Sequence, residues 1–131
     1  MDRTTAVVRK TTEDYLETIL MIQETQGYVR SIDVAEHLGV SKPSVTYSTK
    51  RLKEKGYLKN DHAGMLVLTE SGMKIASDTY KKHKMLTEFF MYIGVSPEQA
   101  REDACKIEHD ISEETFASLC AYAEKTAHVK I

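Results

Sequence analysis

The sequence predicts a mainly α-helical protein with one small β-hairpin: a first unit of short helices plus the hairpin, then a second unit built from helices alone. Apolar residues recur at spacings of three and four in six segments, which is the helical period. Capping residues and glycines bound these segments, and one stretch near the middle alternates strand, polar turn and strand. With 131 residues, 41% of them hydrophobic and 29% charged, the chain has the size of one globular domain or two small ones.

The first predicted helix runs from Thr11 to about Gln26. Thr11 or Thr12 can cap its N-terminus, and Gly27 ends it. The residues that give this segment its helical period are Tyr15, Leu16, Ile19, Leu20 and Ile22.

Two more helices follow in close succession. Ser31 is placed to cap a short helix that stops at Gly39, and Ser41 to cap another that stops at Gly56. Pro43 lies in the first turn of the latter helix, where a missing backbone N–H costs little. Two helices joined by so short a turn are typical of a helix-turn-helix motif.

A hairpin is predicted directly after this motif. Residues 57–60 and 65–68 have strand character, and residues 61–64 form a polar turn between them. A helix-turn-helix followed at once by a small hairpin is a winged helix. Thr69 then caps a long helix to about Ile93, which is long enough to leave one unit and enter another.

The rest of the chain predicts two final helices. Residues 96–99 form a capping box with proline at the first helical position, and this box opens a helix to about Asp110. Ser112, followed by two glutamates, opens the last helix. We therefore expect a winged helix-turn-helix domain over residues 1–71 and a helical domain over residues 72–131.

Charge is segregated along the chain. The net charge of −2 divides into −3 for residues 1–38, +6 for residues 39–84 and −5 for residues 85–131. A basic segment between acidic ends is the footprint of a local phosphate-contact surface. An ordinary solvated face gives the same segregation, so the charge alone leaves both interpretations open.

The basic segment contains the second helix of the helix-turn-helix motif, whose N-terminal residues face base edges in the major groove in proteins of this kind. Ser44 and Tyr47 share a face and are the candidates for base contact, with Ser41 and Pro43 at the start of the helix. A solvated basic helix in a protein–protein module is the alternative. The candidates for phosphate contact are Lys42, Thr46, Lys50 and Lys59.

The acidic ends carry two sets of potential metal ligands, each on one helical face. The first helix offers Asp14 and Glu17, and His83 lies in the second half of the long helix. Carboxylate and imidazole ligands suit Mn, Fe, Co, Ni or Zn, and a cation would offset the repulsion among the carboxylates. The fifth helix contributes, at i, i+3 and i+4, Cys105, Glu108 and His109.

Each of these residues also has an ordinary structural interpretation. Asp14 can favour its helix N-terminus, and Glu17 can be a solvated carboxylate. Cys105 can be a small core residue, and Glu108 with His109 a surface pair. The two cysteines are too few for a disulfide scaffold, and Cys120 is expected in the core.

Four segments of the sequence carry a resemblance to a known family. They are residues 12–19 (TEDYLETI), 32–46 (IDVAEHLGVSKPSVT), 64–72 (GMLVLTESG) and 105–112 (CKIEHDIS). Over nearly its whole length the chain resembles the diphtheria toxin repressor and manganese transport regulator family of metal-dependent winged-helix repressors. The resemblance implies that the metal ligands are Asp14, Glu17, His83, the position of Cys105, Glu108 and His109.

The same resemblance implies the partners and the activity. Residues from about 80 onward would form a helical homodimer interface, for which the apolar candidates are Met85, Leu86, Phe89, Phe90, Phe116 and Leu119. The metal-loaded dimer would bind double-stranded operator DNA and repress metal-uptake genes. Mn²⁺ or Fe²⁺ is the expected cofactor, with Co²⁺, Ni²⁺ or Zn²⁺ as further options, and we expect no enzymatic activity, no small organic substrate and no membrane partner.

The chain departs from the family pattern at named positions. In the manganese branch the position of Asp14 is also aspartate but that of Cys105 is glutamate, whereas the iron branch has methionine and cysteine there. This chain is a hybrid of the two. Thr87 stands where family members often offer a carboxylate, and the SH3-like C-terminal domain of the iron branch is not expected.

Two rival functions remain from the sequence. One is a winged-helix regulator that senses a small organic ligand or nothing, with the acidic cluster purely structural. The other is a carboxylate di-metal enzyme, which normally needs two Glu-x-x-His pairs, and no such repeat is present. Because no apolar run approaches about 20 residues and no signal peptide is visible, we expect a cytoplasmic protein.

Overall fold

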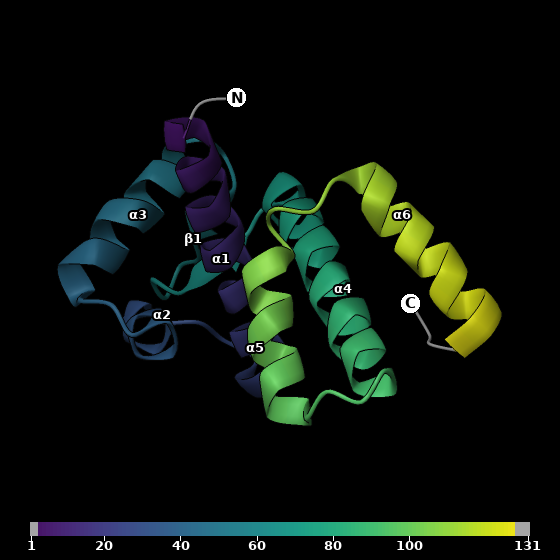
Figure 1. The fold of residues 1–131 in the computed structure, drawn as a ribbon. Helices are drawn as coiled ribbons and strands as arrows, with labels where there is room; N and C mark the ends of the chain where they lie inside the picture. Colours follow the sequence, from purple (N-terminus) through teal and green to yellow (C-terminus); the bar gives the residue numbers. More distant parts are fainter. Residues whose placement is uncertain (1–2, 128–131) are drawn as a thin grey trace. The chain divides into compact units, whose positions relative to one another are not determined.

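The structure is a computed structural model that describes residues 3–127, with side chains from residue 9 to residue 125. Its elements confirm the predicted mainly helical fold with a small wing (Figure 1). In chain order they are α1 (Arg3–Gln26), α2 (Ser31–Leu38), α3 (Lys42–Glu54), β1 (Leu58–Asn60), β2 (Leu66–Leu68), α4 (Glu70–Tyr92), α5 (Pro97–Ile107), α6 (Glu113–Tyr122) and a π-helical turn, η1 (Ala123–Ala127).

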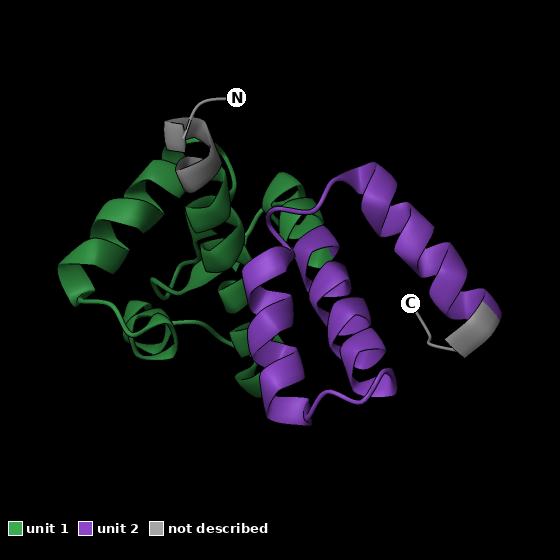
Figure 2. Cartoon of the chain, in the orientation of Figure 1, with its two compact units in different colours: residues 1–77 green, residues 78–131 purple. Residues whose placement is uncertain are grey.

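The chain divides into two compact units, residues 1–77 and 78–131 (Figure 2). The division falls within α4, which begins in the first unit and ends in the second. None of the described helices combines the length and apolar character needed to cross a membrane.

Serine caps fix the start of three helices, as the sequence predicts. The hydroxyl oxygens of Ser41, Ser96 and Ser112 each accept a hydrogen bond from the backbone N–H three residues later, at 3.1–3.3 Å. These bonds satisfy one of the backbone donors that the first turn of a helix leaves without a helical partner.

The predicted start of two helices was wrong. α1 begins at Arg3, not at Thr11, because the preceding residues contain no glycine or proline that would stop a helix. The cap of α2 is Arg30, and Ser31 is already the first helical residue. The side chain that secures this start belongs to Asp33.

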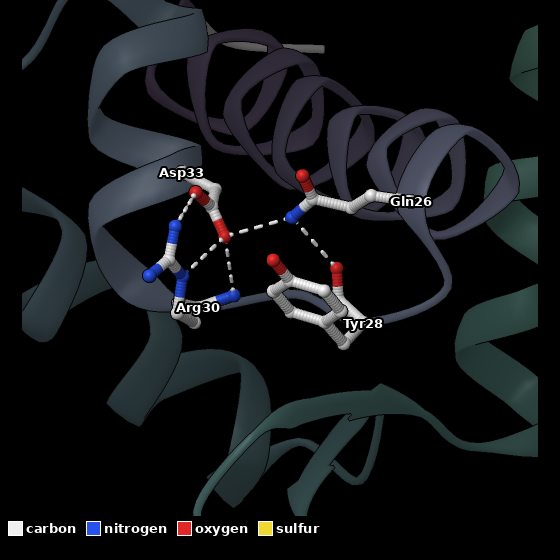
Figure 3. A network of polar contacts seen from close by, with 4 residues as sticks. All are labelled: Gln26, Tyr28, Arg30 and Asp33. Carbon is white, nitrogen blue, oxygen red and sulfur yellow. Dashed lines mark hydrogen bonds and ion pairs between the residues drawn. The ribbon is translucent and has the colours of Figure 1, made fainter.

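Asp33 is the centre of a polar network at the α1–α2 connection (Figure 3). Its carboxylate accepts hydrogen bonds from the backbone N–H of Arg30 at 3.0 Å, from the Arg30 guanidinium at 2.9 and 3.1 Å, and from Gln26 Nε2 at 3.0 Å. Gln26 Nε2 also donates to the carbonyl oxygen of Tyr28. The hydrogen bonds from Arg30 lower the pKa of Asp33 to about 2.

The wing is a two-stranded antiparallel sheet in which Leu58 pairs with Leu68 and Asn60 with Leu66. Leu58, Leu66 and Leu68 are buried, so the hairpin packs one face into the first unit. The backbone N–H of Leu66 also donates to the carbonyl oxygen of Val29 at 2.8 Å, which joins the extended segment after α1 to the wing. The fully buried core residues of this unit include Leu16, Ile19, Val29, Val34 and Val45.

The first turn of α4 is tied to the turn between α3 and β1. The hydroxyl of Thr69 donates to the carbonyl oxygen of Gly56 at 2.6 Å, and the hydroxyl of Ser71 donates to the same oxygen at 3.1 Å. The backbone N–H of Thr69 donates to the carbonyl oxygen of Tyr57 at 3.0 Å. At Gly72 any Cβ atom would collide with this Tyr57 carbonyl, so only glycine permits the approach. We call these contacts the α4 latch.

The second unit has its own core, which corrects one expectation. Met85 and Leu86 are fully buried within the single chain and form this core together with Ala104 and Phe116. They therefore do not contact a partner subunit as the sequence suggested, because the unit's own packing uses them. The partly buried residues packed against this core are Phe89, Phe90, Ile111, Leu119 and Cys120.

Candidate metal centre and nucleic-acid interface

Helix α3 presents one face to the core and the opposite face to solvent. Val45, Thr49 and Leu52, at i, i+4 and i+7, are buried. The residues predicted to contact DNA are exposed on α3, at its cap or, in the case of Lys59, on β1: Ser41, Lys42, Pro43, Ser44, Thr46, Tyr47, Lys50 and Lys59. The structure therefore leaves every predicted DNA-contacting residue accessible to a ligand.

A contact that the sequence analysis missed lies on the exposed face of α3. The side chain of Tyr47 is 64% exposed, and Arg51, one turn later, donates a hydrogen bond from its guanidinium to the Tyr47 hydroxyl oxygen at 3.0 Å. The same guanidinium lies over the Tyr47 ring, 5.6 Å from its centroid. The i, i+4 spacing of a tyrosine and an arginine was the available signal, because such pairs are neighbours on a helix.

Within the second unit, three of the predicted metal ligands are in contact. His83 comes from α4, and its Nδ1 lies 2.9 Å from Oε2 of Glu108. The other carboxylate oxygen of Glu108, Oε1, lies 3.4 Å from Nε2 of His109. Each oxygen of this one carboxylate therefore faces a different imidazole. We call these three residues the His–Glu–His cluster.

The end of α5 explains how two adjacent residues reach one cluster. α5 ends at Ile107, and Glu108 is its C-cap, with a backbone N–H that donates to the Ala104 carbonyl oxygen at 3.0 Å. His109 follows in the turn after the helix. Because the backbone is no longer helical there, the side chains of these two adjacent residues can reach the same cluster. Glu108 is 1% exposed and His109 is 4% exposed, which corrects the alternative interpretation of this pair as a surface pair.

Helix α1 of the first unit carries the other two predicted carboxylate ligands. Asp14 is half-buried and Glu17 is buried, and their i, i+3 spacing places them on one face of the helix. Glu17 is therefore not the solvated carboxylate of the alternative interpretation.

The ordinary interpretation of both cysteines as core residues agrees with the structure for Cys120 and not for Cys105. Cys105 is exposed on α5, where the neighbouring Ala104 occupies the core position, so Cys105 is not a core residue. Cys120 is half-buried and packs against the core of the second unit, where burial raises the pKa of its thiol. The hydroxyl of Thr87 donates a hydrogen bond to the carbonyl oxygen of His83 at 2.8 Å.

The donor set of the His–Glu–His cluster fits a divalent transition metal. Two imidazoles and a carboxylate are ligands that Mn²⁺, Fe²⁺, Co²⁺, Ni²⁺ and Zn²⁺ all accept. Neighbouring ligand atoms that each lie about 2.0–2.2 Å from an ion are about 3.0–3.4 Å apart, for octahedral and tetrahedral geometry respectively. The distances of 2.9 Å from His83 Nδ1 to Oε2 of Glu108 and of 3.4 Å from His109 Nε2 to Oε1 are of this size, so each imidazole is spaced from its own Glu108 oxygen as two ligands of an ion are.

Two models of known protein families match the chain, one over the winged helix and one over the helices that carry the donor cluster. A family model for the N-terminal DNA binding domain of iron dependent repressors matches residues 8–66. A second model, for the metal binding and dimerisation domain of iron dependent repressors, matches residues 69–129. The chain belongs to the iron dependent repressor family. It is thus a member of a family of metal-dependent, DNA-binding transcriptional regulators, as the sequence resemblance implied.

Relatives of this repressor come from several bacteria. The transcriptional regulator MntR of Salmonella typhimurium is 35% identical over 117 residues, which is 89% of this chain and 74% of the relative. The HTH-type transcriptional regulator MntR of Bacillus subtilis is 40% identical over 100 residues, which is 76% of this chain and 70% of the relative.

Solved structures show the same fold. A manganese-dependent transcriptional repressor in complex with manganese matches with a TM-score of 0.79 and 30% identity, over 86% of this chain and 52% of that one. The IdeR structure of T. acidophilum matches with a TM-score of 0.75 and 28% identity, over 88% of this chain and 53% of that one. The repressor thus spans about half the length of these two structures.

Proposed function

We propose that this repressor is activated by Mn²⁺ or Fe²⁺ and that its metal-loaded homodimer binds operator DNA and represses genes for uptake of that metal. Residues 1–71 would bind DNA, and residues 72–131 would bind metal and form the dimer. The observation that carries the proposal is the His–Glu–His cluster, in which Glu108 and His109 are buried, in a chain that also presents an exposed recognition helix. Because operator DNA is the partner, we place its action in the cytoplasm.

The proposed metal ligands come from both units. Glu108 is the central member, because its two oxygens face two imidazoles. A bound ion supplies positive charge that stabilises several carboxylates together, at a distance at which they would otherwise repel one another. The proposed ligands are Asp14, Glu17, His83, Cys105, Glu108 and His109.

The proposed DNA surface divides into two roles. Ser44 and Tyr47 read base edges, and Ser41 and Pro43 fix the start of the helix that carries them. The basic and hydroxyl side chains contact phosphates, which give affinity and salt dependence but no sequence information. These phosphate contacts are Lys42, Thr46, Lys50 and Lys59.

The activation mechanism follows from the location of the ligands on different units. Helix-turn-helix dimers need paired recognition helices about 34–36 Å apart, or a multiple of it. An ion held by ligands from α1 and from the second unit favours one arrangement of the two units. It shifts the population toward the DNA-binding arrangement only by its difference in affinity for the two states.

The test is operator binding against buffered free Mn²⁺, Fe²⁺ and Zn²⁺. We expect binding to strengthen with metal in the parent, and Glu108→Gln to abolish this dependence. Glu114→Gln is the matched control, because Glu114 is an exposed carboxylate on α6 of the same unit. Operator binding that is independent of all three metals would refute the proposal.

The same titration tests the second candidate function. The 2.9 Å contact between His83 and Glu108 is also the geometry of a purely structural ion pair in a regulator that does not sense metal. In that case Glu108→Gln would lower the free energy of unfolding, while metal would change operator binding in neither protein. The manganese named for one of the solved structures above supports the metal-sensing function.

A further inference from the structure

Arg51 lies on the same helix as the proposed DNA contacts but is not one of them. Its guanidinium bonds to the Tyr47 hydroxyl oxygen at 3.0 Å and covers the Tyr47 ring at 5.6 Å. An arginine on a helix next to DNA would ordinarily be interpreted as a phosphate contact. Here the guanidinium is directed at a neighbouring side chain that is itself a candidate for base readout.

Tyr47 needs such a restraint, because packing holds it only weakly. Its side chain is 64% exposed. On one side it borders a hollow of about 240 Å³ between α1 and α3, whose lining also includes Thr12, Tyr15 and Leu52. A tyrosine ring with open space beside it has other rotamers available, and ordering it on binding costs conformational entropy.

We propose that Arg51 is a positioning residue for base readout, which holds the Tyr47 phenol in place and leaves its O–H free to donate to a base. This inference rests on the proposed role of Tyr47 in DNA binding. It adds a second residue to sequence recognition and specifies the chemistry of the base edge that Tyr47 contacts.

The chemistry follows from the hydrogen-bonding capacity of the two groups. A guanidinium has donors only, so the Tyr47 oxygen accepts from Arg51. The phenol hydrogen is then available as a donor, and donation from a group that already accepts a charged hydrogen bond is strengthened. In the major groove, acceptors are N7 and O6 of guanine, N7 of adenine and O4 of thymine. Tyr47 therefore reads one of these atoms.

A positioning role and a phosphate contact predict different results. Loss of a phosphate contact weakens binding to all DNA sequences alike and lowers the salt dependence. Loss of a positioning residue changes the preference for one base pair, and it changes the same base pair as removal of the group that it positions. Base preference is therefore the readout, since general destabilisation of α3 would not select one base pair.

The experiment measures competition binding to an operator that is substituted at each position in turn, at saturating metal. The variants are Tyr47→Phe, Arg51→Met and the double variant. The matched control is Lys53→Met, which removes one positive charge from an exposed position of the same helix. We expect Tyr47→Phe and Arg51→Met to reduce the preference at the same operator position, by about fivefold or more. The double variant should reduce it no further, and Lys53→Met should leave it intact.

The outcomes separate this inference from the proposed function. If Tyr47→Phe and Tyr47→Ala change no base preference, the proposed role of Tyr47 is wrong. If they do change it but Arg51→Met weakens all sequences evenly, as Lys53→Met does, then Arg51 is a phosphate contact and the inference fails alone.

Base analogues test the donor role of the phenol. At the position identified by Tyr47→Phe, one analogue that lacks a major-groove acceptor should weaken the parent but not the variant. The analogues are 7-deazaguanine, 7-deazaadenine, 2-aminopurine for guanine and 5-methyl-2-pyrimidinone for thymine. If removal of an amino group from adenine or cytosine has this effect instead, Tyr47 accepts from the base and the assigned chemistry is wrong.

Discussion

Asp33 stabilises the start of α2 through its ionised form, and the sign of its pH dependence follows from its pKa. In the folded chain the hydrogen bonds from Arg30 lower the pKa of Asp33 to about 2, whereas an unfolded aspartate has a pKa of about 3.9. The charged carboxylate therefore stabilises the fold above about pH 4. This contribution is lost as the pH falls through the folded value.

We expect Asp33→Asn to lower the free energy of unfolding at pH 7 by about 0.5–1 kcal/mol, the range of a lost helix cap and an exposed ion pair. The difference from the parent should shrink as the pH falls from 4 toward 2. Urea unfolding of both proteins across this range is the measurement. Glu36→Gln, an exposed carboxylate on the same helix, is the control. A difference that grows at low pH would contradict the assignment.

Cys105 sets the metal preference in our second prediction. A thiolate is softer than a carboxylate and favours Fe²⁺, Co²⁺ or Zn²⁺ over Mn²⁺. Cys105→Glu should therefore lower the free Mn²⁺ concentration needed for operator binding, with a smaller gain for Zn²⁺ or Fe²⁺. The measurement is an operator-binding titration against each buffered metal.

If Cys105→Glu leaves the free Mn²⁺ concentration at half-maximal operator binding unchanged, while His109→Ala abolishes metal-dependent operator binding, then Cys105 is not a metal ligand. Cys105 is exposed on α5, so its replacement by glutamate does not disturb core packing. A change in metal response would therefore come from the ligand itself. A sulfur that is not a ligand would then have no structural role in the core either.

At this scale the sequence predicts which residues matter better than how they interact. Residue type and spacing were enough to select His83, Glu108 and His109, which the structure brings into contact. The Arg51–Tyr47 contact was not predicted, because its formation depends on rotamers that spacing does not determine. The burial of Glu108 depends in the same way on tertiary packing.

Among the helices, the α4 latch determines how replacement of Gly72 changes the free energy of unfolding. In an exposed helix interior, alanine is more favourable than glycine by about 1 kcal/mol. At Gly72 the added methyl group would meet the Tyr57 carbonyl. We expect Gly72→Ala to lower the free energy of unfolding by about 1–3 kcal/mol, as overpacked sites do.

Thermal and urea unfolding of Gly72→Ala check this sign. Ser77→Ala lies on the exposed side of the same helix and should be neutral or slightly stabilising. A gain in stability for Gly72→Ala would mean that α4 can move away from the turn at little cost.

Helix α3 gives a prediction about salt. We expect Lys50→Ala to weaken binding to all DNA sequences alike and to reduce the slope of log K against log salt by about one. Lys106→Ala removes an exposed lysine from α5 and should leave the slope unchanged. A slope equal to the parent's for Lys50→Ala would remove this residue from the phosphate contacts.

Helix ends were predictable where a cap determines them and not elsewhere. Ser41, Ser96 and Ser112 cap the helices for which they were proposed, since a hydroxyl at that position satisfies a backbone donor. α1 extends past its candidate caps because no glycine or proline upstream stops the helix. The start of α2 depends on the side chain of Asp33, the third residue of the helix, and not on a capping serine.

At the scale of the whole molecule, we expect the dimer to survive removal of metal. The second unit has its own apolar core around Met85 and Leu86. The exposed large apolar residues that the structure describes in this unit, available to a second copy, are Met91, Tyr92, Ile93, Ile107 and Tyr122. Burial of such surface favours association without any contribution from charge.

Sedimentation of the metal-loaded and chelated protein at micromolar concentration is the measurement. An unchanged mass together with weaker operator binding is the expected result. Dissociation to monomers on chelation would show that metal holds the two subunits together. Tyr92→Ser provides the converse case, in which the dimer should weaken whether or not metal is present.

The α4 latch also allows the wing to change in length independently of the helices on either side. The carbonyl oxygen of Gly56 accepts from Thr69, thirteen residues later, so both ends of the hairpin are fastened at one point. A loop whose ends are already joined tolerates a change in length cheaply, at about 0.6 kcal/mol for a doubling of its residues. Insertions at the tip, residues 61–64, would then lengthen the reach of the wing along a DNA groove, and deletions there would shorten it, while α3 and α4 stay in place. Evolution and engineering can thus alter the wing of this repressor separately from the helices that flank it.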